Sequence, residues 1–134
     1  MENKIHEDEN LFRAIKRSKP DWMDNFGKPT PAMYKDKGGN SVDRDDKRDE
    51  NEIIEFMENG IFKGRLKGVV KVNAGKCMKA PILARVAADP KDNNPYHANI
   101  FIDEDEKRSS LQALMLADSS VVVYLNESMN WVYI

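Results

Sequence analysis

The apolar positions of this chain fall into short runs separated by polar segments rich in glycine and proline. Runs of this length, enriched in β-branched and aromatic residues, are typical of β-strands. Residues 121–125 are the clearest case. The predicted strands are residues 11–16, 32–35, 41–42, 66–72, 81–87, 98–102, 121–125 and 131–134, with 81–87 returning along 66–72.

Two segments have helical spacing instead. Apolar residues recur every three or four positions across 53–61, which indicates a helix with one buried face. Asp49 followed three residues later by Glu52 resembles a capping box at the start of this helix. A second helix is predicted to begin at Ser110, with the apolar residues of 111–115 on one side.

The order of these elements predicts an α+β fold. Most connections between the later strands are too short for parallel crossovers, which favours a mainly antiparallel or mixed sheet with two helices packed on one face. A chain of 134 residues is within the common size range of one domain. We expect residues 1–10 to form a flexible acidic arm and residues 11–134 to form a single domain.

Two polar segments are predicted to be loops. Prolines and a glycine interrupt residues 20–30, where Trp22 and Phe26 are expected to cap the core because large aromatic side chains are rarely left in water. The run 43–51 is almost wholly charged and is expected to be a solvated loop leading into the first helix.

The composition favours an intracellular protein. A single cysteine, Cys77, permits no intramolecular disulfide, as is usual in a reducing compartment. The first ten residues are polar and acidic, which is unlike a signal peptide, and no apolar run approaches the roughly 20 residues needed to cross a bilayer. We therefore expect a cytoplasmic protein with no membrane association.

The net charge of −2 conceals a basic strip between Glu58 and Asp89, a stretch without a single acidic residue. Such a strip suits phosphate, nucleic acid or an acidic protein surface, or it consists of ordinary solvated lysines on two strands. Nucleic-acid binding is disfavoured, because no aromatic residue alternates with the first lysines for base stacking. The basic residues are Lys63, Arg65, Lys67, Lys71, Lys76, Lys79 and Arg85.

No motif for a cofactor or metal is present. The glycines match neither the dinucleotide nor the P-loop spacing, and there are no paired cysteines for zinc. No cofactor and no metal site are therefore expected. Positive neighbours favour a reactive thiol at Cys77, whereas a lone cysteine beside a methionine is more often a packed residue.

The loop Asn94-Pro95-Tyr96-His97 is the strongest candidate site. Proline restricts the residue before it to extended geometry, so the turn aims His97 from the start of a strand. A histidine in this position either shuttles protons and contacts a ligand, with Asn94 and Tyr96 beside it, or ties the loop to backbone carbonyls. Both interpretations stand open.

A second candidate site is Ser41-Val42-Asp43-Arg44. Arg44 is suited to clamp a carboxylate or phosphate with Asp43 orienting it, or it is one charge in a solvated run. Arg13 interrupts an apolar strand, so its side chain either reaches the strand edge or points into a pocket.

These elements carry a family resemblance. The chain resembles, over residues 11–125, a group of small bacterial proteins with no established activity. They share an early arginine, an S-V-D/S-R element and an N-P-x-H-A-x-I element. The resemblance implies a bacterial, cytosolic, stand-alone domain from an accessory locus such as a defence or toxin–immunity system. The segments that carry it are Leu11-Phe12-Arg13-Ala14-Ile15, Pro31-Ala32-Met33-Tyr34-Lys35, Ser41-Val42-Asp43-Arg44 and Asn94-Pro95-Tyr96-His97-Ala98-Asn99-Ile100.

The chain is also similar, more weakly, to ADP-ribosyltransferase-like domains, which have an early-strand arginine and a later strand-end serine. Their third-strand glutamate has no clear counterpart here, since Glu104 and Glu106 fall in a predicted turn.

Two functions are therefore expected to compete. The leading one is a bacterial binding protein that acts through protein–protein contact, as immunity proteins do. The alternative is an enzyme that binds a nucleotide or phosphorylated ligand with Arg13, Ser41, Arg44 and His97 around one pocket, His97 and Arg13 being the catalytic candidates. A basic surface formed by Lys63, Arg65 and Lys67 remains a third, disfavoured route to a nucleic-acid partner.

Overall fold

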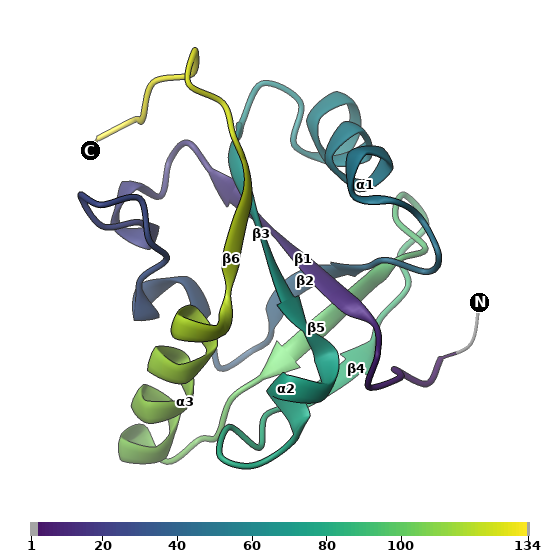
Figure 1. The fold of residues 1–134 in the computed structure, drawn as a ribbon, viewed down its shortest axis with the longest axis vertical. Helices are drawn as coiled ribbons and strands as arrows, with labels where there is room; N and C mark the ends of the chain where they lie inside the picture. Colours follow the sequence, from purple (N-terminus) through teal and green to yellow (C-terminus); the bar gives the residue numbers. More distant parts are fainter. Residues whose placement is uncertain (1–2, 134) are drawn as a thin grey trace.

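The computed structural model describes residues 3–133 and contains one six-stranded sheet (Figure 1). Every pair of neighbouring strands is antiparallel, which confirms the predicted α+β class and mainly antiparallel sheet. The strands follow the order β4-β5-β2-β1-β3-β6. Their bounds are β1 Asn10–Lys16, β2 Asn40–Arg44, β3 Leu66–Asn73, β4 Arg85–Ala88, β5 His97–Phe101 and β6 Val121–Leu125.

Helices of several kinds connect the strands. The longest is α3, Glu106–Ser119, which begins at Asp105, whose carboxylate accepts from the amide of Arg108. Helix α1, Glu50–Phe56, continues into a π-helical turn. The shorter segments are the 3-10 turns Pro20–Trp22 and Pro31–Tyr34, the π turn Met57–Ile61 and α2, Ala74–Met78.

The helices are divided between the two faces of the sheet, not gathered on one as predicted. Successive strand residues point to opposite faces. Leu11 and Ile15 of β1 join a core cluster with Leu116 of α3, whereas Phe12 of β1 joins a second cluster with Ile53 of α1. Figure 1 accordingly shows α1 and α3 on opposite sides of the strands.

The helix signals were correct in kind and partly wrong in position. The capping box at α1 is confirmed, since the Asp49 carboxylate accepts from the amide of Glu52 at 2.8 Å. The second helix begins before Ser110, because Asp105 provides the cap instead.

Two predicted strands are wrong, and a third, 81–87, is right only for its last residues, which begin β4. Residues 32–35 form a 3-10 turn whose Tyr34 is buried in the larger core, and its hydroxyl bonds to Ser120 at 2.7 Å. Residues 81–87 do not return along β3, because the chain first forms α2 and then crosses the α3 face before joining β5 as β4. Residues 131–133 form no strand, and Ile134 lies outside the described residues.

Of the two aromatics expected to cap the core, one does. Trp22 packs against the larger core cluster. Phe26 is 89% exposed, because it lies in the tight turn that ends at Gly27, whose φ is +77°. The prediction for Phe26 is therefore wrong.

Residues 3–9, predicted as part of a flexible arm, lie against the domain. Ile5 is buried in the larger core, and the Glu7 carbonyl accepts from the amide of Gly75 at 2.9 Å. These two contacts hold the segment against the core and against α2. A frayed arm is thus not what the structure shows for these residues.

The charged run 43–51 does not behave as one solvated loop. Asp43 and Arg44 are the last two residues of β2, and both are buried. The high charge density of 43–51 predicted that all of its side chains would be exposed. Asp43 and Arg44 are buried because β2 pairs with β1 on one side and with β5 on the other.

Candidate functional site

The sheet opens between its two central strands. β1 and β2 pair only at Leu11 with Arg44 and at Phe12 with Asp43. Beyond these pairs β1 follows β3 and β2 follows β5, as the crossing ribbons in Figure 1 show. Two pockets adjoin this opening and have Ala14, Ser41 and Phe62 in common as lining residues.

Arg13 spans the opening. Its Nη1 donates to the carbonyl of Ser41 at 2.7 Å, and its Nε donates to the carbonyl of Met33 at 2.9 Å. The guanidinium also lies 4.5 Å from the ring centroid of Trp22, within cation–π range. These contacts fix the side chain against two backbone carbonyls and an aromatic ring.

The first of the two pockets, the basic pocket, has a volume of about 420 Å³. Its cationic residues outnumber its single acidic residue, Asp36, whose carboxylate already accepts from the amide of Gly38. Trp22 forms an aromatic part of the wall. The cations are Arg13, Lys16, Lys19 and Lys35.

The charge of Arg13 is not neutralised within the described residues. Arg13 is only 6% exposed, yet no carboxylate lies within ion-pair distance of it there. Burial lowers its pKa, and Tyr34 and Asp36 act in the other direction. A buried guanidinium without a counter-ion is costly unless something else stabilises the charge.

Lys16 is affected by the same excess of positive charge in the basic pocket. Burial lowers the pKa of its ammonium, and the nearby cations Lys19 and Arg13 lower it further. Each of these effects disfavours the charged form. An anion in the basic pocket would favour the charged form and so offset these effects.

The second pocket, the Asp43 pocket, is smaller, at about 170 Å³. Its apolar lining residues come from β1, from β2 and from residues 57–62, and its polar ones come from β2, from the loop before β5 and from the first residue of β5. The lining residues are Phe12, Ala14, Ser41, Val42, Asp43, Met57, Ile61, Phe62, Lys91, Asn93, Asn94 and His97.

Asp43 is the buried charge of this pocket, at 4% exposure. Its Oδ1 accepts from Nδ2 of Asn94 at 2.7 Å, whereas Oδ2 has no hydrogen-bond donor among residues 3–133. The nearest cation is Nη2 of Arg48, 4.0 Å from Oδ2. Burial raises the pKa of Asp43, and the Asn94 bond, Arg48 and His97 oppose that rise.

Arg48 belongs to the site although the sequence gave no sign of it. Its guanidinium lies 3.4 Å from the ring centroid of Tyr96, and its Nη2 donates to the carbonyl of Arg44 at 2.6 Å. These contacts explain the position of Tyr96, whose ring also meets Phe56 edge-on. The contact between Arg48 and Tyr96 joins residues 48 positions apart and leaves no local pattern, and the charged neighbours of Arg48 made it resemble a surface residue.

His97 pairs directly with Asp43 across β5 and β2. Its Nδ1 lies 2.9 Å from the carbonyl oxygen of Asp89 and 3.3 Å from the carboxylate of the same residue. Since a carbonyl only accepts, Nδ1 carries the proton in the neutral ring and Nε2 is left as an acceptor. The interpretation that His97 ties the loop to a backbone carbonyl is confirmed, and the residue lines the Asp43 pocket as well.

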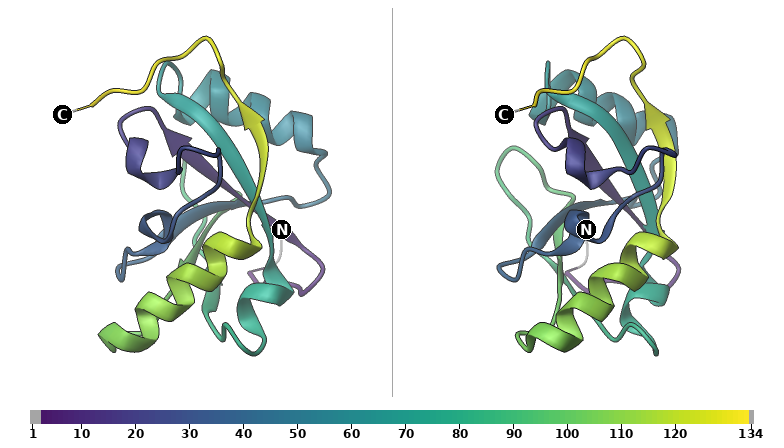
Figure 2. Two further views of the ribbon diagram at one scale, coloured as in Figure 1. Left: turned by 60° about the vertical axis from the view of Figure 1, so that its left-hand side comes forward. Right: turned by 90° about the vertical axis from the view of Figure 1, so that its left-hand side faces the viewer.

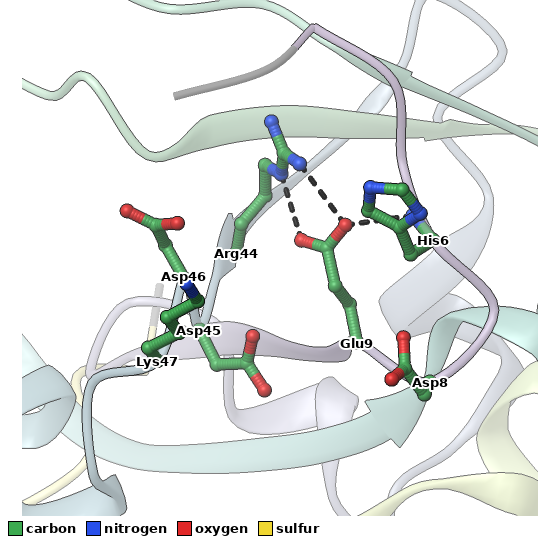
Figure 3. Close-up of a pocket in the computed structure, with 7 residues that line it drawn as sticks. All are labelled: His6, Asp8, Glu9, Arg44, Asp45, Asp46 and Lys47. Carbon is green, nitrogen blue, oxygen red and sulfur yellow. Dashed lines mark hydrogen bonds and ion pairs between the residues drawn. The ribbon is translucent and has the colours of Figure 1, made fainter.

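Arg44 lies in neither of these pockets. It forms a bidentate ion pair with Glu9, with contacts of 2.8 and 3.0 Å, at a third pocket of about 610 Å³ (Figure 3). Figure 3 shows the Glu9 carboxylate between the Arg44 guanidinium and the backbone of His6. The Arg44 pair lowers the pKa of Glu9 against the effect of burial. The role of Arg44 here is to hold the N-terminal segment on β2.

The four residues of the enzyme hypothesis are thus only partly brought together. Arg13 and Ser41 line the basic pocket, and Ser41 and His97 line the Asp43 pocket. Arg44 is in the third pocket.

The basic strip does not form one surface. Lys67 is buried, and its ammonium donates to the carbonyls of Asn126 and Met129. Lys63 is exposed, and so is Arg65, which folds back onto the carbonyl of Ile61. The strip therefore combines a structural lysine with ordinary surface charges.

Cys77 is a packed core residue. It is fully buried, and burial raises the pKa of its thiol to about 12. The thiol stays protonated at neutral pH, so the structure favours the packing interpretation over the reactive one.

Residues 3–133 contain neither a metal-binding cluster nor a membrane-spanning helix. No group of three or more histidine, cysteine, aspartate or glutamate side chains is arranged to hold a metal ion. No helix in this part of the chain is both long enough and apolar enough to span a membrane.

Comparison with known proteins gave no match: no family model, no curated protein and no solved structure is significantly similar to this chain.

Proposed function

We propose that this domain binds a small ligand through an anionic group, a phosphate or a carboxylate, in the basic pocket. The observation that carries the proposal is Arg13, a buried guanidinium with no carboxylate partner among residues 3–133. Three lysines and one tryptophan surround it.

The guanidinium is held ready for such a ligand. An arginine side chain has five N–H donors, and the two hydrogen bonds found for Arg13 use Nε and Nη1. Arginine binds phosphate and carboxylate through planar, charge-assisted pairs. Because the backbone already fixes the side chain, little further side-chain entropy is lost when an anion binds.

Neighbouring cations add long-range attraction. Lys16 and Lys19 act on one another as like charges, so an anion between them stabilises both ammonium groups. Trp22 offers an apolar surface for the part of the ligand next to the anion. This arrangement supports the ligand-binding alternative over a purely surface-mediated function.

Titration with inorganic phosphate tests the proposal. We expect isothermal titration calorimetry at low salt to detect one site, with the affinity of Arg13→Met at least about tenfold lower, as expected for the loss of one charge-assisted pair. Lys63→Met removes an exposed lysine outside the pocket and is the matched control, with unchanged affinity. Equal losses in both variants would mean non-specific charge attraction and would refute the proposed site.

A protein partner is the second candidate function, and strand β6 is the feature that favours it. β6 pairs only with β3, so its other edge is free of strand partners within the sheet (Figure 2). Its sequence Val-Val-Val-Tyr-Leu contains no charge and no proline, and Val121 is 59% exposed. Apolar edge strands of this kind add strands from partner proteins unless charges block them.

Placing a lysine on this edge tests the second candidate. If a partner pairs with β6, Val121→Lys lowers its capture in a cross-linking experiment from a bacterial lysate, whereas Phe26→Lys, at an exposed site elsewhere, does not. Equal capture by both variants would exclude β6 as the docking edge.

A further inference from the structure

The basic pocket and the Asp43 pocket adjoin each other at the opening between β1 and β2. Ala14, Ser41 and Phe62 line both. The Ser41 carbonyl accepts from Arg13, and Asp43 follows two residues later on the same strand. Two residues of a strand span roughly 7 Å, so a small molecule can reach from one pocket into the other.

Among the polar residues that line the Asp43 pocket, Asp43 and His97 each have a hydrogen-bond acceptor for which no donor is found within residues 3–133, whereas Ser41, Lys91, Asn93 and Asn94 have donor groups. Oδ2 of Asp43 is buried and has no donor among the described residues. Nε2 of His97 is an acceptor as well, because Nδ1 bonds to the carbonyl of Asp89. A buried acceptor left without a donor is destabilising. An occupant of this pocket is therefore expected to bring N–H or O–H groups.

The size and lining of the pocket limit that occupant to about one ring. A cavity of about 150 Å³ lined by apolar side chains accommodates a benzene ring, and the Asp43 pocket is similar at about 170 Å³. Phe12, Met57 and Phe62 provide apolar walls for the flat or hydrocarbon faces of a ring.

A cationic occupant fits less well than a neutral one. Nη2 of Arg48 lies 4.0 Å from Asp43, and Lys91 also lines the pocket, paired with Asp89 at 3.0 Å. An ammonium group would meet both of these positive charges. Neutral hydroxyl or ring N–H donors would not.

We propose that the two pockets form one bipartite site for a phosphorylated ring compound, with the phosphate at Arg13 and a ring bearing neutral N–H or O–H donors at Asp43. A sugar phosphate and a nucleotide share this chemistry. The inference rests on the proposed anion site and adds the second pocket and the class of ligand.

A series of three ligands tests the inference with the folded, full-length chain. The probes are inorganic phosphate, ribose 5-phosphate and uridine 5′-monophosphate, titrated into the wild-type protein, Arg13→Met and Asp43→Asn. We expect at least one of the two ring compounds to bind the wild type at least about tenfold more tightly than phosphate, as an added buried hydrogen bond to a charged group provides. The tighter of the two identifies a sugar or a base as the ring.

The variants separate the two pockets. Asp43→Asn is expected to reduce the advantage of the ring compound to less than about threefold, because the amide nitrogen opposes a ligand donor. Its affinity for inorganic phosphate should remain within about twofold of the wild type, since Asp43 does not line the basic pocket. Arg13→Met should weaken all three ligands.

Magnetic resonance spectra give a second measurement that does not depend on the variants. The ring compound should shift the signals of both the Trp22 indole and the Asn94 side-chain amide, whereas inorganic phosphate should shift that of Trp22 alone. If phosphate binds but neither ring compound gains affinity nor shifts Asn94, the bipartite site is wrong and the anion site stands. If inorganic phosphate also fails to bind, both proposals are wrong.

Discussion

Two buried arginines on the same face of the central strands have opposite surroundings. Arg44 is 4% exposed and forms a bidentate pair with Glu9. Arg13 is buried to a similar degree but contacts two carbonyls and two aromatic rings, with no carboxylate partner among residues 3–133. Burial of a charge alone therefore does not distinguish a structural role from a binding role, whereas the nature of the partner does.

The pockets beside the two arginines differ in the same way. The third pocket, beside Arg44, is surrounded mostly by acidic residues, and the most deeply buried of them, Glu9, is already paired. The basic pocket beside Arg13 has four cations and one carboxylate. The first arrangement is complete within the protein, and the second has positive charge left for a ligand.

The largest expected effect on stability comes from breaking the ion pair between Arg44 and Glu9. Arg44→Met leaves the Glu9 carboxylate buried without its cation, and we expect a loss of about 2–3 kcal/mol in the free energy of unfolding. This is below the full cost of breaking a deeply buried pair, because the pair borders the third pocket and water can reach it. Urea denaturation measures the change.

The double variant Glu9→Met/Arg44→Met is the control for that prediction. Replacing both charges by apolar side chains should recover most of the loss, since no buried charge is then left unpaired. A single variant as stable as the wild type would mean that Arg44 and Glu9 do not hold the N-terminal segment.

Arg13→Met is expected to reduce ligand affinity strongly and stability only slightly. The affinity for inorganic phosphate should decrease at least about tenfold, while the free energy of unfolding decreases by only about 1–2 kcal/mol from the two carbonyls left without a donor. Calorimetric titration and urea denaturation of the same preparation measure the two quantities. A stability loss as large as that of Arg44→Met, with unchanged affinity, would assign Arg13 a structural role.

Asp43 is a buried carboxylate that, like Arg13, lacks a close ion-pair partner within the described residues, and it should make the stability of the protein depend on pH. Because burial raises its pKa, the folded protein holds a proton there at pH values where the unfolded chain, with a pKa near 3.8, has lost it. Stability therefore falls as pH rises from about 3.8 through the folded pKa, and the deficit persists above it. Asp43→Asn should be more stable than the wild type at pH 7 by about 1 kcal/mol, the lower end of the cost of a buried acceptor without a donor.

The difference between Asp43→Asn and the wild type should shrink as pH falls toward 3.8. Thermal or urea unfolding at several pH values measures it, and the effect of Glu9 cancels because both proteins contain that residue. A difference that is constant with pH would mean that Asp43 does not titrate differently in the folded state.

The smallest expected effect is that of Lys16→Met. Lys16 lies beside Arg13 in the basic pocket and is only partly buried. Its removal should lower the affinity for phosphate by about three- to tenfold through lost Coulomb attraction and change the free energy of unfolding by less than about 0.5 kcal/mol. An affinity unchanged at low salt would place the anion away from β1.

Much of the sheet was predictable because strands leave a local signal. The alternating apolar residues of 66–72 and the β-branched run 121–125 became β3 and β6 as predicted. The segment 32–35 failed because its apolar residues suit a strand or a short helix equally, and the proline at position 31 favours the first turn of a helix. The pairing of β4 with β5 depends on distant contacts that no local pattern contains.

The candidate site was predictable in its residue types and not in its geometry. Arg13 and His97 were recognised because a charge in an apolar strand and a histidine at a strand start are unusual. Their separation into adjoining pockets follows from the divergence of β1 and β2, which depends on the strands that pair on either side. Arg48 was missed because its aromatic partner, Tyr96, is distant in sequence and its neighbours are all charged.

The strand order also has a consequence for the synthesis of the chain. β1 lies between β2 and β3, and its longer pairing, which joins Asn10 to Asn73, awaits a segment made much later. Ribosomes add about 5–20 residues per second, so the apolar β1 waits several seconds for that partner. Ser41 waits a similar time for Asn99 of β5, which is made later than Asn73. The Ser41 carbonyl, which fixes Arg13, therefore reaches its final place only after β5 has been made.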